Sequence, residues 1–244
     1  MYKRGQVALF VIIAILIVSA AFTLLYTQTE LFKKAEANPE IAPVESFIKN
    51  CVKSTGEDAL IFIGQQGGYY ELPKLSVSGY SYYFYDNKSV MPSKEKIESE
   101  LSKYMNEMLP FCTQNFVDFP DFNVEANPNA VRTKTTIIRD KVIFDIEWQV
   151  LIKKADSTYR LSSFLFEIPS RLNTIYAVVQ NMTLRQLEDP SSICLSCLTN
   201  FEIQNDLYIY MNNYGNDTVI FTISDNKTWI NKNPYEFVFA NKYG

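Results

Sequence analysis

The hydrophobic and polar positions divide the chain into one long apolar segment followed by shorter amphipathic ones. Residues 7–25 are all apolar or small, with one serine and one threonine among them, and no acidic residue occurs before Glu30. A helix rises about 1.5 Å per residue, so this segment is long enough to cross a hydrocarbon core of about 30 Å. Lys3 and Arg4 precede it, and basic flanks tend to stay in the cytoplasm. The pattern predicts a cytoplasmic stub and a transmembrane or signal helix within 1–26, with the remaining chain outside.

Helical spacing of apolar residues recurs at three places beyond this segment. Residues 27–42 contain helix formers and then Pro39, and Pro43 follows directly, which predicts a stalk and a linker. Residues 43–66 form the first predicted helix, with Gly67 as its C-cap and Gly56 as a point where it could break. Two further helices are expected, one after Ser93 over 94–109 and one after Ser170 that ends before Pro190.

Alternation of apolar and polar residues predicts the strands. Between 142 and 152 every second residue is apolar and most of the intervening ones are charged or polar, which is typical of a half-buried antiparallel strand. The element order predicts an α+β fold with an antiparallel sheet and about three helices, in one extracytoplasmic domain over 43–244. The other predicted strands are 75–86, 131–138, 158–167, 206–211, 218–223 and 235–240.

Composition and charge narrow the classes of function. The chain has 23 basic and 27 acidic residues, and all the acidic ones follow the apolar segment, which argues against a nucleic-acid-binding surface. Histidine is absent, so histidine-based triads and histidine-containing metal sites are excluded. We expect no enzyme activity, no cofactor and no metal ion.

The four cysteines all lie beyond the apolar segment, where an oxidising compartment favours disulfides. We favour Cys51–Cys112 and Cys194–Cys197 among the three pairings, because Cys194 and Cys197 are close in sequence and their pairing leaves Cys51 for Cys112. The first bridge would close a loop of about 60 residues and stabilise the fold by about 3–4 kcal/mol. Cys194 and Cys197 also have the spacing of a redox-active pair, although no following helix is evident. A four-cysteine metal site is the remaining use of these residues.

Two groups of residues are candidates for contact and modification. Tyr80, Tyr82, Tyr83 and Tyr85 crowd one predicted strand, and aromatic side chains concentrate binding energy at contact surfaces. Packing of one of their faces into the core is the alternative. Four N-glycosylation sequons are present, at Asn87, Asn181, Asn216 and Asn226.

The first residues resemble a known processing signal. Lys3-Arg4-Gly5-Gln6, directly before the apolar segment, is similar to the class III signal of archaeal type IV pilin-like proteins. That resemblance implies cleavage between Gly5 and Gln6, with the apolar helix kept as an anchor or filament core. Many pilins carry glutamate at the fifth mature position, where this chain has Phe10. A retained, uncleaved anchor and full removal after Ala20 are the other two readings.

A looser resemblance extends further along the chain. The same type of N-terminus, a cysteine-containing helix and Gln66-Gly67-Gly68-Tyr69 are similar to single-pass surface proteins of archaea. Together these features predict a membrane-anchored, extracytoplasmic structural or adhesion protein with one membrane span. Its expected partners are copies of itself, other surface proteins or glycans, and not nucleic acid. A pilin-like filament subunit is the first alternative, and a thiol–disulfide oxidoreductase using Cys194 and Cys197 is the second.

Overall fold

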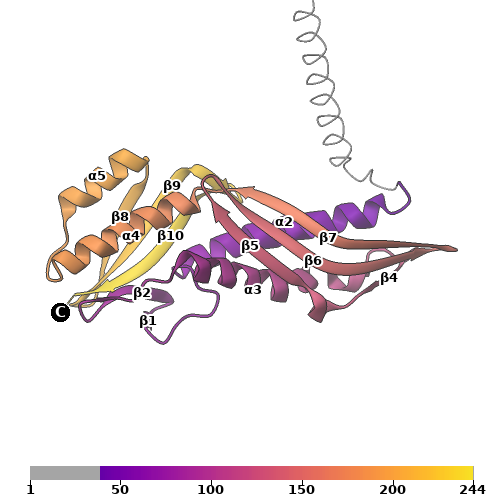
Figure 1. Ribbon diagram of the computed structural model, residues 1–244, viewed down its shortest axis with the longest axis horizontal. Coiled ribbons are helices and arrows are strands. Elements are labelled where there is room, and N and C mark those ends of the chain that lie inside the picture. Colours follow the sequence, from indigo (N-terminus) through magenta and orange to yellow (C-terminus); the bar gives the residue numbers. More distant parts are fainter. Residues whose placement is uncertain (1–38, 244) are drawn as a thin grey trace, which may run out of the picture. The chain divides into compact units, whose positions relative to one another are not determined.

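Four α-helices and ten strands are distributed along residues 39–243, the part of the chain that the computed structural model describes (Figure 1). From Pro43 onward the chain forms one compact unit. It has the predicted α+β class, with four helices where about three were expected. The helices are α2 (Ala42–Gln65), α3 (Lys94–Thr113), α4 (Leu172–Glu188) and α5 (Leu195–Asn205), with 3₁₀ turns at Gln114–Phe116 and Pro128–Ala130. The strands are β1 (Ser76–Val77), β2 (Tyr80–Tyr85), β3 (Lys88–Ser89), β4 (Asn123–Ala126), β5 (Arg132–Ile138), β6 (Lys141–Lys154), β7 (Ser157–Pro169), β8 (Tyr208–Tyr214), β9 (Thr218–Ile230) and β10 (Asn233–Lys242).

The strands form two sheets instead of the one that the sequence predicted. The six-stranded sheet has the order β1-β2-β10-β9-β8, with β3 also paired to β2. In the four-stranded sheet, β6 pairs with β7 along its length and with β5 and then β4 on its other edge. All pairings are antiparallel except that of β2 with β10, which is parallel. The expectation of a purely antiparallel sheet is therefore wrong for the six-stranded sheet.

Helix α2 packs against both sheets. A Cβ atom on Gly56 would lie 3.0 Å from Ile168 of β7, and one on Gly64 would lie 2.6 Å from the carbonyl oxygen of Glu236 in β10. The helix does not break at Gly56, the point where a break was considered possible, and the glycine instead permits close contact inside an uninterrupted helix. The helix ends at Gln65, and Gly67 terminates it as predicted, with a φ of +65° and hydrogen bonds from Gly67 N to Gly64 O and from Gly68 N to Ile63 O.

Helix α3 covers one edge of the four-stranded sheet. Ser93 caps the helix by accepting a hydrogen bond from the Lys96 N–H at 3.2 Å, as predicted. Three polar side chains of α3, spaced four residues apart, accept hydrogen bonds from alternate backbone N–H groups of edge strand β5. The pairs are Glu98 with Ile137 at 2.7 Å, Ser102 with Thr135 at 3.0 Å and Asn106 with Thr133 at 2.7 Å. The helix thus satisfies an edge that would otherwise be open to pairing.

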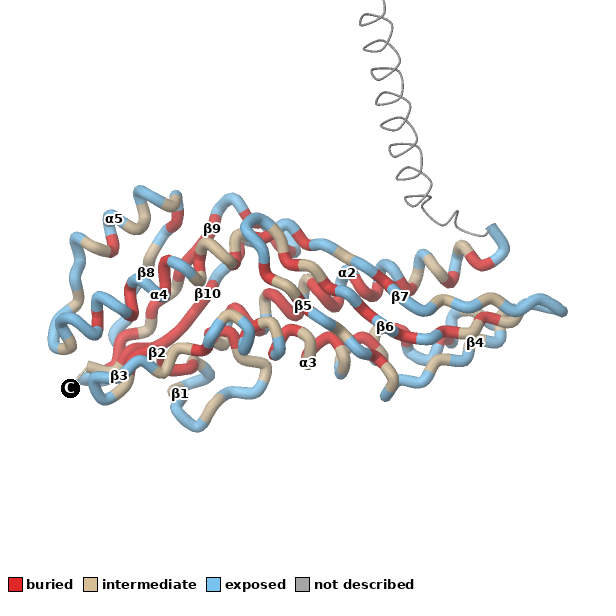
Figure 2. The backbone as a smooth tube through the Cα atoms, viewed as in Figure 1, coloured by how far each residue is buried: buried red, intermediate tan, exposed pale blue. Residues whose placement is uncertain are grey.

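The predicted alternation in β6 matches its burial. All the apolar residues of one face, from Val142 to Ile152, are buried, and Asp145, Glu147 and Gln149 on the other face are exposed. Figure 2 shows buried residues along the facing sides of α2, α3 and the sheets. Trp148 donates from its ring N–H to the Asn127 carbonyl at 2.9 Å, which satisfies its polar atom inside the core.

Helices α4 and α5 pack against the six-stranded sheet. Arg171, and not the predicted Ser170, is the N-cap of α4, although Ser170 accepts a hydrogen bond from the Leu172 N–H at 3.2 Å. Arg171 also pairs with the fully buried Asp225 of β9 at 2.7 Å and donates to the backbone oxygens of Asn205 and Asp206 at the end of α5. Helix α5 was not predicted, and it buries only Leu198.

The predicted transmembrane helix lies outside the described residues. Between residues 39 and 243, no helix is long and apolar enough to span a bilayer. The stub and helix of 1–26, and most of the 27–42 stalk, therefore remain sequence-based predictions.

Candidate functional site

The structure pairs the cysteines as the sequence favoured. Cys51 of α2 is bonded to Cys112 of α3, with Cα atoms 5.6 Å apart, and Cys194 is bonded to Cys197 at the start of α5. The first bridge joins two core helices, and Cys51 is buried. The second closes a loop of only four residues at the surface. The two bridges therefore have different structural roles.

The predicted tyrosine surface on β2 is mostly core. Tyr82 and Tyr83 are 8% and 0% exposed, so the prediction that they form a contact surface is wrong, while Tyr80 and Tyr85 are half-buried. The physical reason is that β2 is an interior strand paired with β10. Tyr83 stacks on Phe239 and donates a hydrogen bond to the Gly67 carbonyl at 2.8 Å. Burial raises the pKa of Tyr83 well above its usual value, so its hydroxyl remains a donor.

Exposed tyrosines lie instead on β8, the edge strand of the six-stranded sheet. Tyr208, Tyr210 and Tyr214 are 46%, 53% and 44% exposed, and they occupy alternate positions on one face of the strand. Six of the seven residues of β8 are exposed, and the strand contains no charged residue and no proline. The hydroxyl of Tyr214 accepts a hydrogen bond from Ser78 at 2.5 Å. The sequence signal is present, as three tyrosines in the seven residues YIYMNNY, but the predicted strand ends at residue 211 and so omits Tyr214.

The backbone edge of β8 is only partly covered. Glu202 of α5 accepts a hydrogen bond from the Ile209 N–H at 2.7 Å, so this N–H points away from β9. Backbone groups alternate along a strand, which places the N–H and C=O groups of Met211 and Asn213 on the same outer edge. Neither residue has a partner on that side within the described part of the chain. This edge differs from that of β5, where α3 satisfies three N–H groups.

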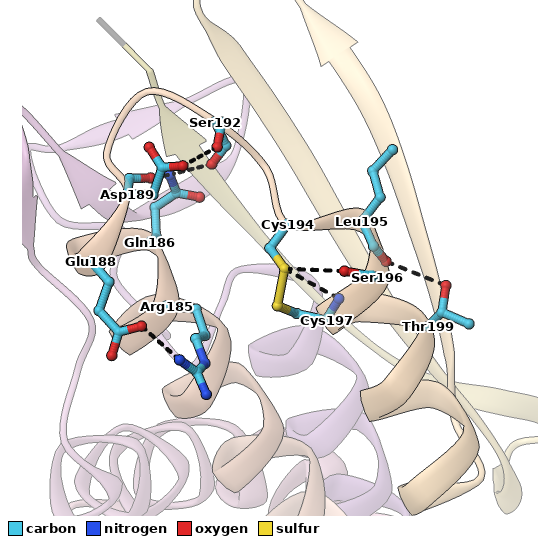
Figure 3. Close-up of a disulfide and its surroundings, with 10 residues drawn as sticks. All are labelled: Arg185, Gln186, Glu188, Asp189, Ser192, Cys194, Leu195, Ser196, Cys197 and Thr199. Atoms are coloured by element: carbon cyan, nitrogen blue, oxygen red, sulfur yellow. Dashed lines mark hydrogen bonds and ion pairs between the residues drawn. A yellow bond between two sulfur atoms is a disulfide. The ribbon is translucent and has the colours of Figure 1, made fainter.

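The second candidate site is the Cys194–Cys197 bridge (Figure 3). Cys194 is the N-cap of α5, and its sulfur accepts a hydrogen bond from the Cys197 N–H at 3.3 Å and lies 3.6 Å from the Ser196 hydroxyl. Cys194 is exposed and Cys197 is half-buried. The expectation that no helix follows this pair is wrong, because α5 begins directly after Cys194.

A small cavity of about 30 Å³ lies beside the bridge, lined by both cysteines, by Phe201 of α5 and by Asn241 of β10. Asn241 is 2% exposed, and its side-chain oxygen has no hydrogen-bond partner among residues 39–243. Gln186 of α4 holds the loop before α5 through hydrogen bonds to the carbonyls of Asp189 and Ser192.

The asparagines of the four sequons, Asn87, Asn181, Asn216 and Asn226, are all exposed, whereas among their hydroxyl residues Ser89 is exposed and Thr183, Thr218 and Thr228 are buried. The processing site Gly5–Gln6 lies outside the described residues. No cluster of three metal-binding side chains occurs within the described range.

Comparison with known proteins finds no matching family model, no matching curated protein and no matching solved structure.

Proposed function

We propose that this protein is a membrane-anchored structural protein of the cell surface whose exterior domain assembles with a second copy through β8. The observation that carries the proposal is the open edge of β8, with exposed tyrosines and two unpartnered backbone residues. The apolar segment at 7–25 supports the anchor, and the two disulfides support an oxidising exterior.

The other long edge strands carry features that prevent pairing with another chain. Strand β5 has Arg132 and Lys134 and is covered by α3, and β7 has Arg160 and Glu167 and ends at Pro169. Charges, proline and helix coverage are the usual protection of sheet edges. Strand β8 has no charged residue and no proline, and a helix side chain covers its edge only at Ile209. A strand without this protection favours pairing with another strand.

The sequence of β8 is complementary to itself in one antiparallel register. With the two-fold axis at Asn212, Met211 and Asn213 of one copy pair with Asn213 and Met211 of the other, and these are the two residues with unpartnered edge groups. Tyr210 then lies opposite Tyr214 of the second copy on both sides of the axis. Opposed aromatic pairs contribute roughly 0.2–1 kcal/mol each, and the Ile209 N–H can stay bound to Glu202.

Photo-crosslinking of the full-length protein in native membranes tests this contact. A benzophenone amino acid at Asn212 should give an adduct of twice the chain mass, linked to residues 210–214 of the second copy. Tyr210→Lys should abolish the adduct, because it places a charge on the edge. Leu165→Lys is the matched control, since Leu165 is 68% exposed on β7 of the other sheet, and it should leave the adduct unchanged.

An adduct with a different protein, or with a glycan, would overturn assembly with a copy and identify the partner class instead. A chain that remains uncrosslinked at its native density would also overturn it.

A pilin-like filament is the second candidate, and the Lys3-Arg4-Gly5-Gln6 sequence favours it. A two-fold contact through β8 closes at a dimer, whereas a filament requires head-to-tail contacts that repeat without closing. N-terminal sequencing of the protein from native membranes separates the two. A mature chain that begins at Gln6, together with polymers in electron micrographs, would support the filament, and a chain that retains Lys3 and Arg4 would exclude this processing.

A further inference from the structure

We propose that Cys194 and Cys197 form a redox-active pair that exchanges disulfides with thiol-containing polypeptides. This activity is independent of assembly through β8. The structure supplies the feature that the sequence lacked, an eleven-residue helix that begins directly after Cys194. The bridge lies where the loop after α4 joins the start of α5 (Figure 3), and Cys194 is exposed, so that a second polypeptide can reach its sulfur.

The two sulfurs have different environments, which assigns their roles. Cys194 is exposed. Its sulfur accepts a hydrogen bond from the Cys197 N–H at 3.3 Å, and the Ser196 hydroxyl lies 3.6 Å from the same sulfur. Donors of this kind, together with the start of a helix, stabilise a thiolate more than a thiol. Cys194 is therefore the sulfur that a substrate attacks and the better thiolate in the reduced pair. Cys197 is half-buried and acts as the resolving cysteine.

Reduction of this pair leaves the fold intact. The bridge spans a sequence separation of 3, against 61 for Cys51–Cys112, so its opening releases little chain entropy. Helix α5 remains attached at its other end through Arg171, which binds the Asn205 and Asp206 carbonyls, and through Glu202, which binds the Ile209 N–H. The pair can therefore change oxidation state without unfolding the domain.

The buried oxygen of Asn241 is a second, independent observation at the same site. It lines the same cavity as both cysteines and lacks a hydrogen-bond donor in the oxidised structure. A disulfide offers no donor, whereas the thiol of reduced Cys197 is one. Because an unsatisfied buried acceptor is unfavourable, Asn241 should favour the reduced pair and make the disulfide a stronger oxidant.

The exchange balances without any further reactant. A substrate thiolate attacks Cys194 Sγ, the bond to Cys197 breaks, and its electron pair leaves on Cys197 Sγ, which takes up the proton released by the substrate thiol. A second substrate thiol then loses its proton and attacks the substrate sulfur of the mixed disulfide. Cys194 leaves as a thiolate stabilised by the Cys197 N–H. The substrate dithiol has lost two electrons and two protons and has become a disulfide. The cysteine pair has gained both electrons, Cys197 holds one of the protons, and the proton of the second substrate thiol passes to the solvent.

The surroundings favour substrates with apolar residues beside their cysteines. Leu195, next to Cys194, is 61% exposed, and Ile193 and Phe201 line the adjoining cavity. An extended polypeptide could place an apolar side chain against Leu195 while its thiol reaches Cys194. The substrate class that these apolar contacts favour is thus a cysteine-containing polypeptide.

Equilibration of the full-length protein with glutathione buffers tests the proposal. After acid quenching and alkylation, mass spectrometry reports the oxidation state of each pair in the same molecule, and Cys51–Cys112 serves as the internal reference. We expect Cys194–Cys197 to become reduced at glutathione ratios at least tenfold more oxidising than those that reduce Cys51–Cys112. Equal resistance of the two bridges would overturn the proposal.

Single variants then test the assigned roles. Cys197→Ser should trap a mixed disulfide with a cysteine-containing peptide at Cys194, and Cys194→Ser should trap at least tenfold less at Cys197 under the same conditions. Asn241→Leu should shift the glutathione equilibrium toward the disulfide by about tenfold, while Asn200→Ala, at an exposed position of α5, should leave it unchanged. Equal trapping by both cysteine variants would overturn the assignment of Cys194 as the attacked sulfur.

Discussion

At the scale of single residues, Asp225 is a buried carboxylate that accepts three hydrogen bonds. It is fully buried, and its oxygens accept hydrogen bonds from Arg171 and Thr228 at 2.7 Å and from the Lys227 N–H at 3.1 Å. Arg171 in turn binds the end of α5, so one ion pair connects β9, α4 and α5. The net stabilisation from a buried ion pair is smaller than the destabilisation caused by removing one of its partners. Removal of one partner leaves an uncompensated charge in a low-dielectric environment.

Asp225→Asn should therefore lower the free energy of unfolding by about 3–5 kcal/mol, since Arg171 would lose its counter-charge. Urea unfolding monitored by circular dichroism measures the change. Glu188→Gln is the control, because Glu188 pairs with Arg185 on the surface of α4 and its loss should have little effect. A similar small effect for both variants would show that the buried pair is not an organising contact.

Glu100 makes a smaller contribution that depends on pH. Burial alone would raise the pKa of its carboxyl. The Lys96 ammonium at 2.6 Å and the N–H groups of Tyr70 and Glu71 lower this pKa by more than burial raises it, so the net shift is downward from 4.5. A depressed folded pKa contributes stability above the unfolded value that is lost as pH falls through the folded value. Wild type should thus exceed Glu100→Gln in unfolding free energy at pH 7, and the difference should shrink between pH 5 and pH 3. A difference that is constant with pH would contradict the ionised role of Glu100.

The four sequons differ in the accessibility of their hydroxyl residue. Ser89, which completes the sequon of Asn87, is exposed beside a tight turn, whereas Thr183 is buried and donates to the Val179 carbonyl inside α4. We expect a glycan at Asn87 and none at Asn181, because the modifying enzyme must reach both residues. Loss of one glycan mass from Asn87→Gln, measured on the intact protein from native cells, checks this. A glycan at Asn181 would show that modification precedes folding of α4.

At the scale of elements, local pattern predicted most of the helices and strands, and long-range pairing determined the rest. Alternation identified β6 because its two faces differ in burial, and the glycine at 67 identified the end of α2. Helix α5 escaped prediction because it buries only Leu198 and so lacks an apolar stripe. Strand β8 continues through Asn212, a turn-forming residue, because pairing with Ile220 of β9 outweighs its local preference.

The candidate sites were predictable only in part for the same reason. The cysteine pairing followed from spacing, but the helix that distinguishes Cys194 from Cys197 did not. The tyrosines of β2 are buried because β2 pairs with β10, more than a hundred residues later in the chain, and no local pattern reports that pairing. The exposed tyrosines of β8 lie at an edge for the converse reason, since no later strand covers it.

Helix α2 provides an element-scale prediction through its two buried glycines. Gly64→Ala should be destabilising by about 1–3 kcal/mol, because the added Cβ would lie 2.6 Å from the rigid carbonyl of Glu236. Gly56→Ala should have a smaller effect. Its neighbours are the tips of the Ile168 and Phe144 side chains, which can shift, and alanine gains about 1 kcal/mol of helix propensity over glycine. Thermal unfolding of both variants would decide this, and equal effects would indicate that α2 does not contact β10 so closely.

At the scale of the whole compact unit that begins at Pro43, helix α2 and the Cys51–Cys112 disulfide connect the two sheets and helix α3. Helix α2 contacts the four-stranded sheet near Gly56 and the six-stranded sheet near Gly64. The bridge fixes the same helix to α3, which covers the β5 edge of the four-stranded sheet. Because both sheets share α2, they should unfold together in a single transition and not as two independent bodies.

The last prediction compares the two disulfides within this cooperative unit. Replacing Cys51 and Cys112 with alanine opens a loop with a sequence separation of 61 and should lower the free energy of unfolding by about 4 kcal/mol, whereas the same change at Cys194 and Cys197 should have a much smaller effect. Urea unfolding of the two double variants, followed by both fluorescence and circular dichroism, measures the difference. Suppose that the fluorescence and circular dichroism transitions coincide and that the urea midpoint falls only for the Cys51–Cys112 variant. This bridge would then stabilise the fold, and Cys194–Cys197 could open during disulfide exchange without unfolding the domain. A comparable loss in the Cys194–Cys197 variant would mean that the second bridge is structural, because a pair that must open during exchange cannot also be required to hold the domain together.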